Sequence, residues 1–99
     1  MYLVRDIMYC KPGQVRPMVE KFTALAKLSK KMGVESMRVM TDVSAEQYWT
    51  VVAEMEVKSL EEYTEMSRSS MNDKKFQKIM KGYHDLIQSG RREIYKLEK

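Results

Sequence analysis

The most regular pattern in the chain covers residues 47–57, where hydrophobic and polar side chains largely alternate. A period of two with many β-branched and aromatic residues is typical of a β-strand. One face of this strand carries Trp49, Val51, Ala53, Met55 and Val57, and the other carries Tyr48, Thr50, Val52, Glu54 and Glu56. We therefore expect the central strand of a small sheet here, with helices covering the face of Trp49.

Residues 2–10, 34–41 and 91–97 also alternate and predict three further strands. The polar residues 42–46 connect the second of these to the central strand, which predicts a hairpin. We expect the helix-facing side of the sheet to carry Leu3, Ile7, Met37, Val39, Trp49, Val51, Ala53, Met55 and Ile94, with Arg5 and Tyr9 on the same side. The opposite side should carry Val4, Met8, Val34, Met40, Tyr48, Val52 and Tyr95, with Asp6, Arg38, Glu54 and Glu93 among them.

Between residues 14 and 32 the hydrophobic period changes to that of a helix. Its apolar stripe consists of Val15, Met18, Val19, Phe22, Leu25, Ala26 and Ser29. Pro17 is tolerated in the first turn, where its missing N–H would have no partner. Gly33 should end the helix, and Lys30 and Lys31 complement the negative end of its dipole.

A second helical region begins at Ser59, because Ser59 and Glu62 form a capping box ahead of helically spaced apolar residues. The polar residues 67–73 interrupt the pattern, and Asn72 or Asp73 can cap a new start. The stripe then resumes with Phe76, Ile79, Met80, Tyr83 and Ile87, and Gly90 should end it. We expect one kinked helix or two abutting segments.

The predicted order is therefore βαββαβ in an α+β, ferredoxin-like fold. Right-handed crossovers give a four-stranded antiparallel sheet with both helices on one face and the first and third strands in the centre. The other face would be partly apolar and uncovered in a monomer, which usually marks an interface. A two-fold homodimer with the sheets packed face to face would bury it, provided that Arg38 pairs with carboxylates.

Composition narrows the class of protein. The 99 residues fit one domain, 1–99, with a small core. The sequence has no long apolar run and no signal-peptide pattern at its start, and Cys10 is its only cysteine, so we expect a cytoplasmic protein that does not enter membranes. The net charge of +4 is modest, and its lysines lack interleaved aromatics or a phosphate-binding loop, so nucleic acid is not an expected partner.

The strand order, the turn at Lys11–Gly13, the aromatic third strand and the ending LIQSGRREIY together resemble the dimeric α+β barrel superfamily. Within it the chain is most similar to small NIPSNAP-like and antibiotic-biosynthesis-monooxygenase-like domains. The resemblance implies a homodimer with a small-molecule pocket between sheet and helices in each subunit. Its members include cofactor-free oxygenases, isomerases, haem-degrading enzymes and domains of unknown activity, so the fold alone does not fix the function.

The candidate pocket combines aromatic walls with a few polar groups, the usual make-up of a ligand site. Its expected substrate-binding residues are Trp49, Tyr9, Tyr63, Tyr83 and Met37. Arg5 would hold a polar group of the ligand, since an arginine between Leu3 and Ile7 needs a carboxylate partner. His84, the only histidine, would be the base. The structural alternative is that the aromatics are core, that Arg5 reaches the sheet edge and that His84 lies on the surface.

Other chemistries find less support in the sequence. Haem-degrading relatives combine a helical histidine with an asparagine on the first strand, and this chain has no asparagine there. No spacing of metal ligands is present, Cys10 has no histidine nearby in sequence, and we expect no cofactor. Two hypotheses remain open. One is a cofactor-free oxygenase or isomerase acting on an aromatic or polyketide-like compound, and the other is a non-catalytic ligand-binding or dimerisation module.

Overall fold

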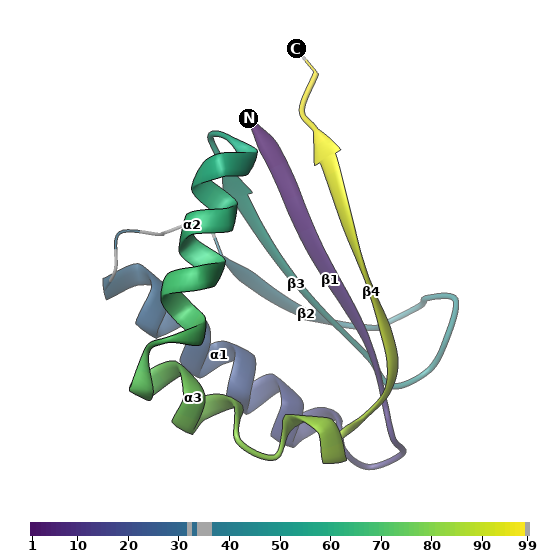
Figure 1. The fold of residues 1–99 in the computed structure, drawn as a ribbon. Helices are drawn as coiled ribbons and strands as arrows, with labels where there is room; N and C mark the ends of the chain where they lie inside the picture. Colours follow the sequence, from purple (N-terminus) through teal and green to yellow (C-terminus); the bar gives the residue numbers. More distant parts are fainter. Residues whose placement is uncertain (32, 34–36, 99) are drawn as a thin grey trace.

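A computed structural model describes residues 1–31, 33 and 37–98. The expected strand residues 34–36, which include Val34, and the expected helix end at Met32 lie outside the described residues. Figure 1 shows one sheet with the helices on one of its faces. The elements in chain order are β1 (Tyr2–Cys10), α1 (Val15–Lys31), β2 (Arg38–Thr41), β3 (Thr50–Val57), α2 (Leu60–Met71), α3 (Lys74–Met80), the 3-10 turn η1 (Tyr83–Asp85) and β4 (Ile87–Lys96).

The sheet is antiparallel with the strand order β2-β3-β1-β4, so the first and third strands are central, as predicted. Tyr2 pairs with Lys96 at one end of β1 and β4, which brings the two ends of the described chain together (Figure 1). The predicted ferredoxin-like α+β fold is thereby confirmed.

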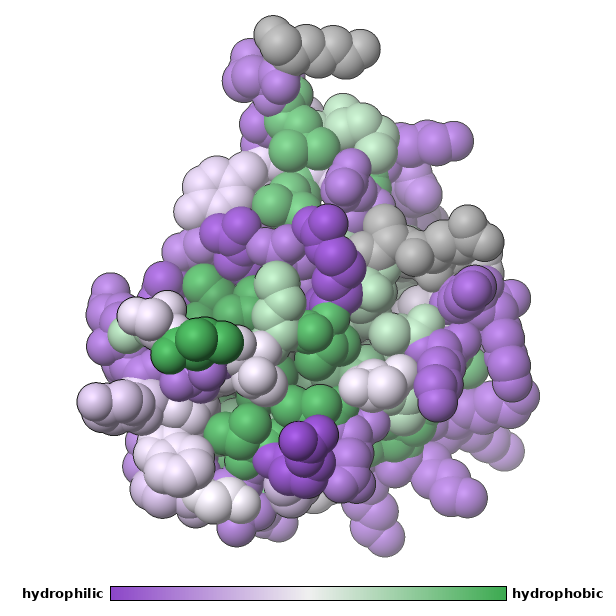
Figure 2. Space-filling model, turned by 180° about the vertical axis from the view of Figure 1, so that it is seen from behind, coloured by the Kyte–Doolittle hydropathy of each residue, from purple (hydrophilic) through white to green (hydrophobic). Residues whose placement is uncertain are grey.

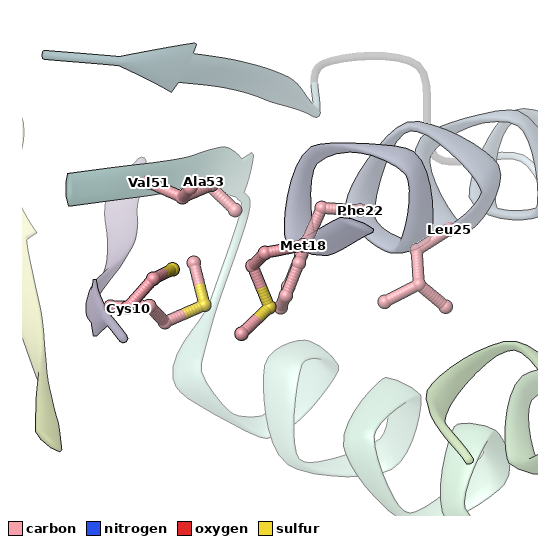
Figure 3. Packing of buried hydrophobic residues seen from close by; sticks show 7 residues of the cluster. Cys10, Met18, Phe22, Leu25, Val51 and Ala53 are labelled. Atoms are coloured by element: carbon pink, nitrogen blue, oxygen red, sulfur yellow. The ribbon is translucent and has the colours of Figure 1, made fainter. Parts of the chain in front are cut away.

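The core lies between α1 and the two central strands. Met18, Phe22 and Leu25 of α1 are buried, and they recur at the helical spacing that the sequence shows. They meet the helix-facing side chains of β1 and β3, namely Met8, Cys10, Val51 and Ala53 (Figure 3). This cluster is the main apolar burial that holds α1 against the sheet.

The second helical region is divided, because two separate caps satisfy its N–H groups. The Ser59 hydroxyl accepts a hydrogen bond from the Glu62 N–H at 3.1 Å and begins α2. The Asp73 carboxylate accepts from the N–H groups of Lys75 and Phe76, at 2.7 and 3.1 Å, and begins α3. The predicted interruption between the two segments is therefore confirmed, with Asp73 as the second cap.

Two predicted boundaries are wrong. Gly82 adopts a left-handed conformation (φ 82°) after α3, which ends the helical path well before Gly90. β4 therefore begins at Ile87 instead of Arg91, and Ile87 pairs with Cys10 beyond a bulge. On the other side of the sheet, β3 begins at Thr50, because Trp49 has a φ of 63° that no strand residue can adopt.

The predicted facing of β1 is also wrong. Met8 pairs with Val51, and Asp6 pairs with Ala53. Directly paired residues share a sheet face, so the even-numbered residues of β1 face the helices. Val4, Asp6 and Met8 therefore lie on the helix side, whereas the residues expected there lie on the open side, namely Leu3, Arg5, Ile7 and Tyr9.

Candidate functional site

A cavity of about 450 Å³ lies between the helix side of the sheet and the three helices. Its size fits a small organic ligand. Most of its wall is apolar, contributed by Met8, Phe22, Leu25, Met37, Met55, Met66, Met71, Phe76 and Met80. Six of these are methionines, from a chain that contains ten. Methionine side chains are flexible and polarisable, so such a wall can adapt to a bound ring system.

The polar end of the cavity is formed by Asp6 of β1, Arg92 of β4 and the two tyrosines Tyr63 and Tyr83. Asp6 and Arg92 pair across the two strands, and Arg92 Nε donates to Asp6 Oδ1 at 2.6 Å. The Arg92 guanidinium also lies over the Tyr63 ring, 5.5 Å from its centre. The hydrogen bond to Asp6 is the main reason that the pKa of Arg92 is raised, so this group stays charged.

Burial raises the pKa values of both cavity tyrosines, and the charge of Asp6 raises them further, against an opposing effect of Arg92. Tyr63 and Tyr83 are therefore protonated phenols at neutral pH and can donate a hydrogen bond. The Tyr83 ring is fixed on one side by an edge contact with Phe22 of α1, with 6.4 Å between ring centres. The site thus offers apolar walls and a rigid, mostly donating polar end.

The open side of the sheet carries a continuous row of charges that crosses all four strands. Glu54 of β3 accepts from Arg5 at 2.6 Å and from Arg38 at 2.7 Å, and Glu93 of β4 accepts from Arg91 at 2.9 Å. Arg5 links the two halves, with its Nη1 at 3.7 Å from Glu93. We call these five residues the charge ladder. The cluster predicted on this face included Asp6, and the structure has Arg5 in its place because of the corrected facing of β1.

Burial alone would raise the pKa of Glu54, but the hydrogen bonds and charges of Arg5 and Arg38 outweigh it and lower this pKa. A carboxylate whose pKa is lower in the folded state stabilises the protein above its ordinary pKa near 4.5, and this contribution is lost as the pH falls through the folded value. We therefore expect the free energy of unfolding to fall more steeply below about pH 4.5 in the wild type than in Glu54→Gln. Urea unfolding at a series of pH values measures this, and equal slopes in the two proteins would contradict it.

The expected site residues divide among separate places. Met37, Tyr63 and Tyr83 line the cavity described above. Arg5 and Tyr9 do not, because they lie on the open side and border a second cavity of about 430 Å³ under the 42–49 connection. The carboxylate that Arg5 needs is Glu54, and the Tyr9 hydroxyl accepts a hydrogen bond from Arg91.

The two remaining expected residues lie near the surface. Trp49 is 45% exposed and borders a third, shallow cavity with Tyr48 and Val15, so the prediction that it forms a wall between sheet and helices is wrong. His84 is exposed on η1 and contacts the edge of Tyr83, with 5.2 Å between ring centres. It lines none of the three cavities. A catalytic role for His84 or Arg5 stays a prediction.

Sequence reasoning missed Asp6 and Arg92 as members of the site. The pattern of β1 offered apolar residues on both faces, and the wrong face was assigned to the helices. If the odd-numbered residues of β1 are placed on the open side, Asp6 is the one charged residue between Val4 and Met8 on the helix side. A carboxylate in that position needs a cationic partner on a neighbouring strand.

Within the described residues, no three histidine, cysteine, aspartate or glutamate side chains gather as metal ligands. Cys10 is a free thiol buried in the core, and burial raises its pKa. None of the helices in the described part of the chain has the length and apolar composition needed to cross a membrane.

No protein family model matches the chain, and no curated protein matches its sequence. Its fold is similar to that of a NIPSNAP family protein from Agrobacterium tumefaciens, with a TM-score of 0.84, 12% identity, and coverage of 99% of this chain and 93% of the other. A second NIPSNAP family protein from A. tumefaciens, of unknown function, is similar with a TM-score of 0.83 and 15% identity, and the match covers 100% of this chain and 89% of the other. A candidate antibiotic biosynthesis monooxygenase from Deinococcus radiodurans is similar with a TM-score of 0.73 and 9% identity, and the match covers 100% of this chain and 94% of the other. The resemblance inferred from the sequence is confirmed at the level of the fold.

Proposed function

We propose that this protein binds a small, largely apolar organic molecule in the cavity between the sheet and the helices. The proposal is carried by one observation: a cavity of about 450 Å³ has walls made mainly of methionine and phenylalanine side chains and polar residues gathered at one end. These polar residues are Asp6, Arg92, Tyr63 and Tyr83. Ligand sites usually pair apolar walls with a few placed polar groups in this way. Met37, Tyr63 and Tyr83 are the residues of the expected site that would contact the ligand.

The first candidate activity is cofactor-free oxygenation or isomerisation of an aromatic or polyketide-like compound. It is supported by the likeness in fold to candidate antibiotic biosynthesis monooxygenases. The second candidate is binding without catalysis, and the position of His84 favours it, because the only histidine is exposed and lines none of the three cavities. Both candidates require the same occupied cavity.

We propose further that two copies associate through the open side of the sheet. In Figure 2, which shows the molecule from behind Figure 1, apolar side chains gather in the middle of the view with charged ones around them. Met40 and Tyr95 on this side are 38% and 47% exposed. Val52 of β3 lies on the same side, paired with Ile7 of β1 and Met40 of β2. The charge ladder beside them already pairs its carboxylates with arginines, so covering it would not leave an unpaired acid.

Two neighbouring serines on α2 provide the test of ligand binding. Ser70 lines the cavity, whereas Ser69 is exposed and does not. Ser70→Trp should fill the space and abolish binding of planar bicyclic and tricyclic aromatic compounds that raise the melting temperature of the wild type. Ser69→Trp should bind them as the wild type does. If no such compound shifts the melting temperature, or if Ser70→Trp binds unchanged, the cavity is not the site. Turnover of a bound compound under air, followed by oxygen uptake and mass spectrometry, separates the two candidate activities.

A further inference from the structure

The polar end of the cavity has more free donors than free acceptors. Among the described residues that line this cavity, Asp6 is the only carboxylate, and its Oδ1 already accepts the Nε hydrogen of Arg92 at 2.6 Å. Among the described residues, none accepts a hydrogen bond from the Nη1 and Nη2 atoms of Arg92 or from the hydroxyls of Tyr63 and Tyr83. No buried side-chain donor is left without a partner among the described residues, so these groups are open to solvent in the free protein. A ligand that covers one of them without an acceptor would leave it unsatisfied, which is costly, so a ligand gains most by bringing acceptors.

The strongest of these donors is held in place before any ligand arrives. Asp6 fixes the Nε edge of Arg92, and the Tyr63 ring supports the face of its guanidinium. The side chain of Arg92 is 52% exposed, so it stands at the rim, where a ligand can reach its two η nitrogens. A planar guanidinium with two adjacent N–H groups matches the two oxygens of a carboxylate, or one oxygen that carries a full negative charge.

The rest of the cavity does not favour a second polar group of either charge. The wall away from Arg92 is built from thioether and aromatic side chains, among them Phe22, Met55 and Phe76. Among the described residues, the remaining polar lining consists of Ser29, Ser67 and Ser70 on the helices and Arg91 on β4. The Arg91 guanidinium is engaged on the open side, where it donates to Glu93 and to the Tyr9 hydroxyl. The ligand that fits is therefore apolar along its body and polar at one end.

From this asymmetry we infer that the cavity selects molecules whose planar apolar body ends in an anionic oxygen, bound by the η nitrogens of Arg92 and by a tyrosine hydroxyl. The anionic oxygen belongs to a carboxylate or to an ionised phenol or enol, since both present the same acceptor. The inference rests on the proposed function, because it names the class of ligand for the same cavity. It also gives the Asp6–Arg92 pair a purpose, which is to orient the anion-binding group.

Matched pairs of an anion and its neutral counterpart test this inference by isothermal titration calorimetry at neutral pH. The carboxylate pair is 2-naphthoate and 2-naphthamide, and the phenolate pair is 2,4-dinitro-1-naphtholate and its methyl ether. Charge-assisted hydrogen bonds are about twice as strong as neutral ones, so we expect at least one anion to bind the wild type about tenfold to a hundredfold more tightly than its counterpart. The pair with the larger preference identifies the oxygen.

Three variants assign any preference to Arg92. Arg92→Gln, and the charge-balanced double variant Asp6→Asn with Arg92→Gln, should lose the preference while still binding the neutral compounds. Arg68→Gln on α2 removes one positive charge from an exposed position outside the cavity, and it should keep the preference. Equal affinities for anion and neutral compound in the wild type would overturn the inference and leave the cavity intact as a binding site, as would a preference that survives in both Arg92 variants. If neither member of any pair binds, the proposed function fails together with the inference.

Discussion

Replacing Val52 by aspartate should convert the protein from a dimer to a monomer at micromolar concentration. Val52 lies in the middle of the open side, paired with Ile7 on β1 and Met40 on β2. A two-fold interface through this side would bring two new carboxylates into an apolar contact, next to the existing Glu54. The arginines described on this side, Arg5, Arg38 and Arg91, are already paired with carboxylates. An unpaired buried charge costs about 3–5 kcal/mol, which weakens association by at least a hundredfold.

The measurement is the molar mass by light scattering during size-exclusion chromatography. Leu60→Asp is the matched control, because it makes the same change from apolar to acidic at a position that is 43% exposed at the start of α2, on the helix side. We expect this control to remain a dimer and both variants to keep the circular dichroism of the wild type. A wild type that is already a monomer under these conditions would refute the proposed dimer outright.

Truncating Met18 to alanine should cost the protein a large part of its folding stability. Met18 is fully enclosed between the helix and the sheet, in the cluster with Met8 and Val51. Removing a buried methionine side chain of this size costs about 2–5 kcal/mol, because the lost burial is joined by the cost of the cavity left behind. The total free energy of unfolding of a small domain is only about 5–15 kcal/mol.

Urea unfolding at a fixed protein concentration measures this loss as a lower midpoint with an unchanged slope. Met71→Ala provides the comparison, since Met71 is 67% exposed at the end of α2 and should cost well under half as much. Similar midpoints for the two variants would show that the packing of α1 against β1 and β3 is not what stabilises the fold.

The order of elements could be predicted from sequence because each relied on a local signal. The stripe of Met18, Phe22 and Leu25 has the helical period, and the caps at Ser59 and Asp73 satisfy N–H groups within three residues of themselves. Such signals do not depend on what the element later packs against. The βαββαβ order and the central position of β1 and β3 followed from them.

The facing of β1 could not be predicted in the same way, because both of its faces are partly apolar. Ile7 on the open side and Met8 on the helix side are 7% and 3% exposed, so burial hardly distinguishes them. Only the pairing register between β1 and β3 decides which face of β1 the helices cover. A shift of this register by one residue moves every side chain of the strand to the opposite face of the sheet. This single choice moved Arg5 out of the expected site and Asp6 into it.

The misplaced Trp49 and the early start of β4 have a common physical cause, which is backbone of positive φ. Trp49 at 63° interrupts an alternation that the sequence continues through it, and Gly82 at 82° interrupts a helical stripe that the sequence continues to Ile87. Tryptophan rarely adopts a positive φ, so the residue type gives no sequence signal for a turn at position 49. The carbonyl of Trp49 accepts from the Cys10 N–H at 2.9 Å, a contact between residues far apart in sequence.

The methionine methyl groups offer the most direct measurement of the central claim, that a ligand binds between the sheet and the helices. In a protein labelled with ¹³C at the methionine methyls, titration with whichever of 2-naphthoate and 2,4-dinitro-1-naphtholate binds more tightly should shift the signals of the cavity methionines, namely Met8, Met37, Met55, Met66, Met71 and Met80. Met1 and Met40, which lie outside the cavity, should stay in place. Shifts confined to Met40, or saturable binding that moves none of the six, would contradict the account.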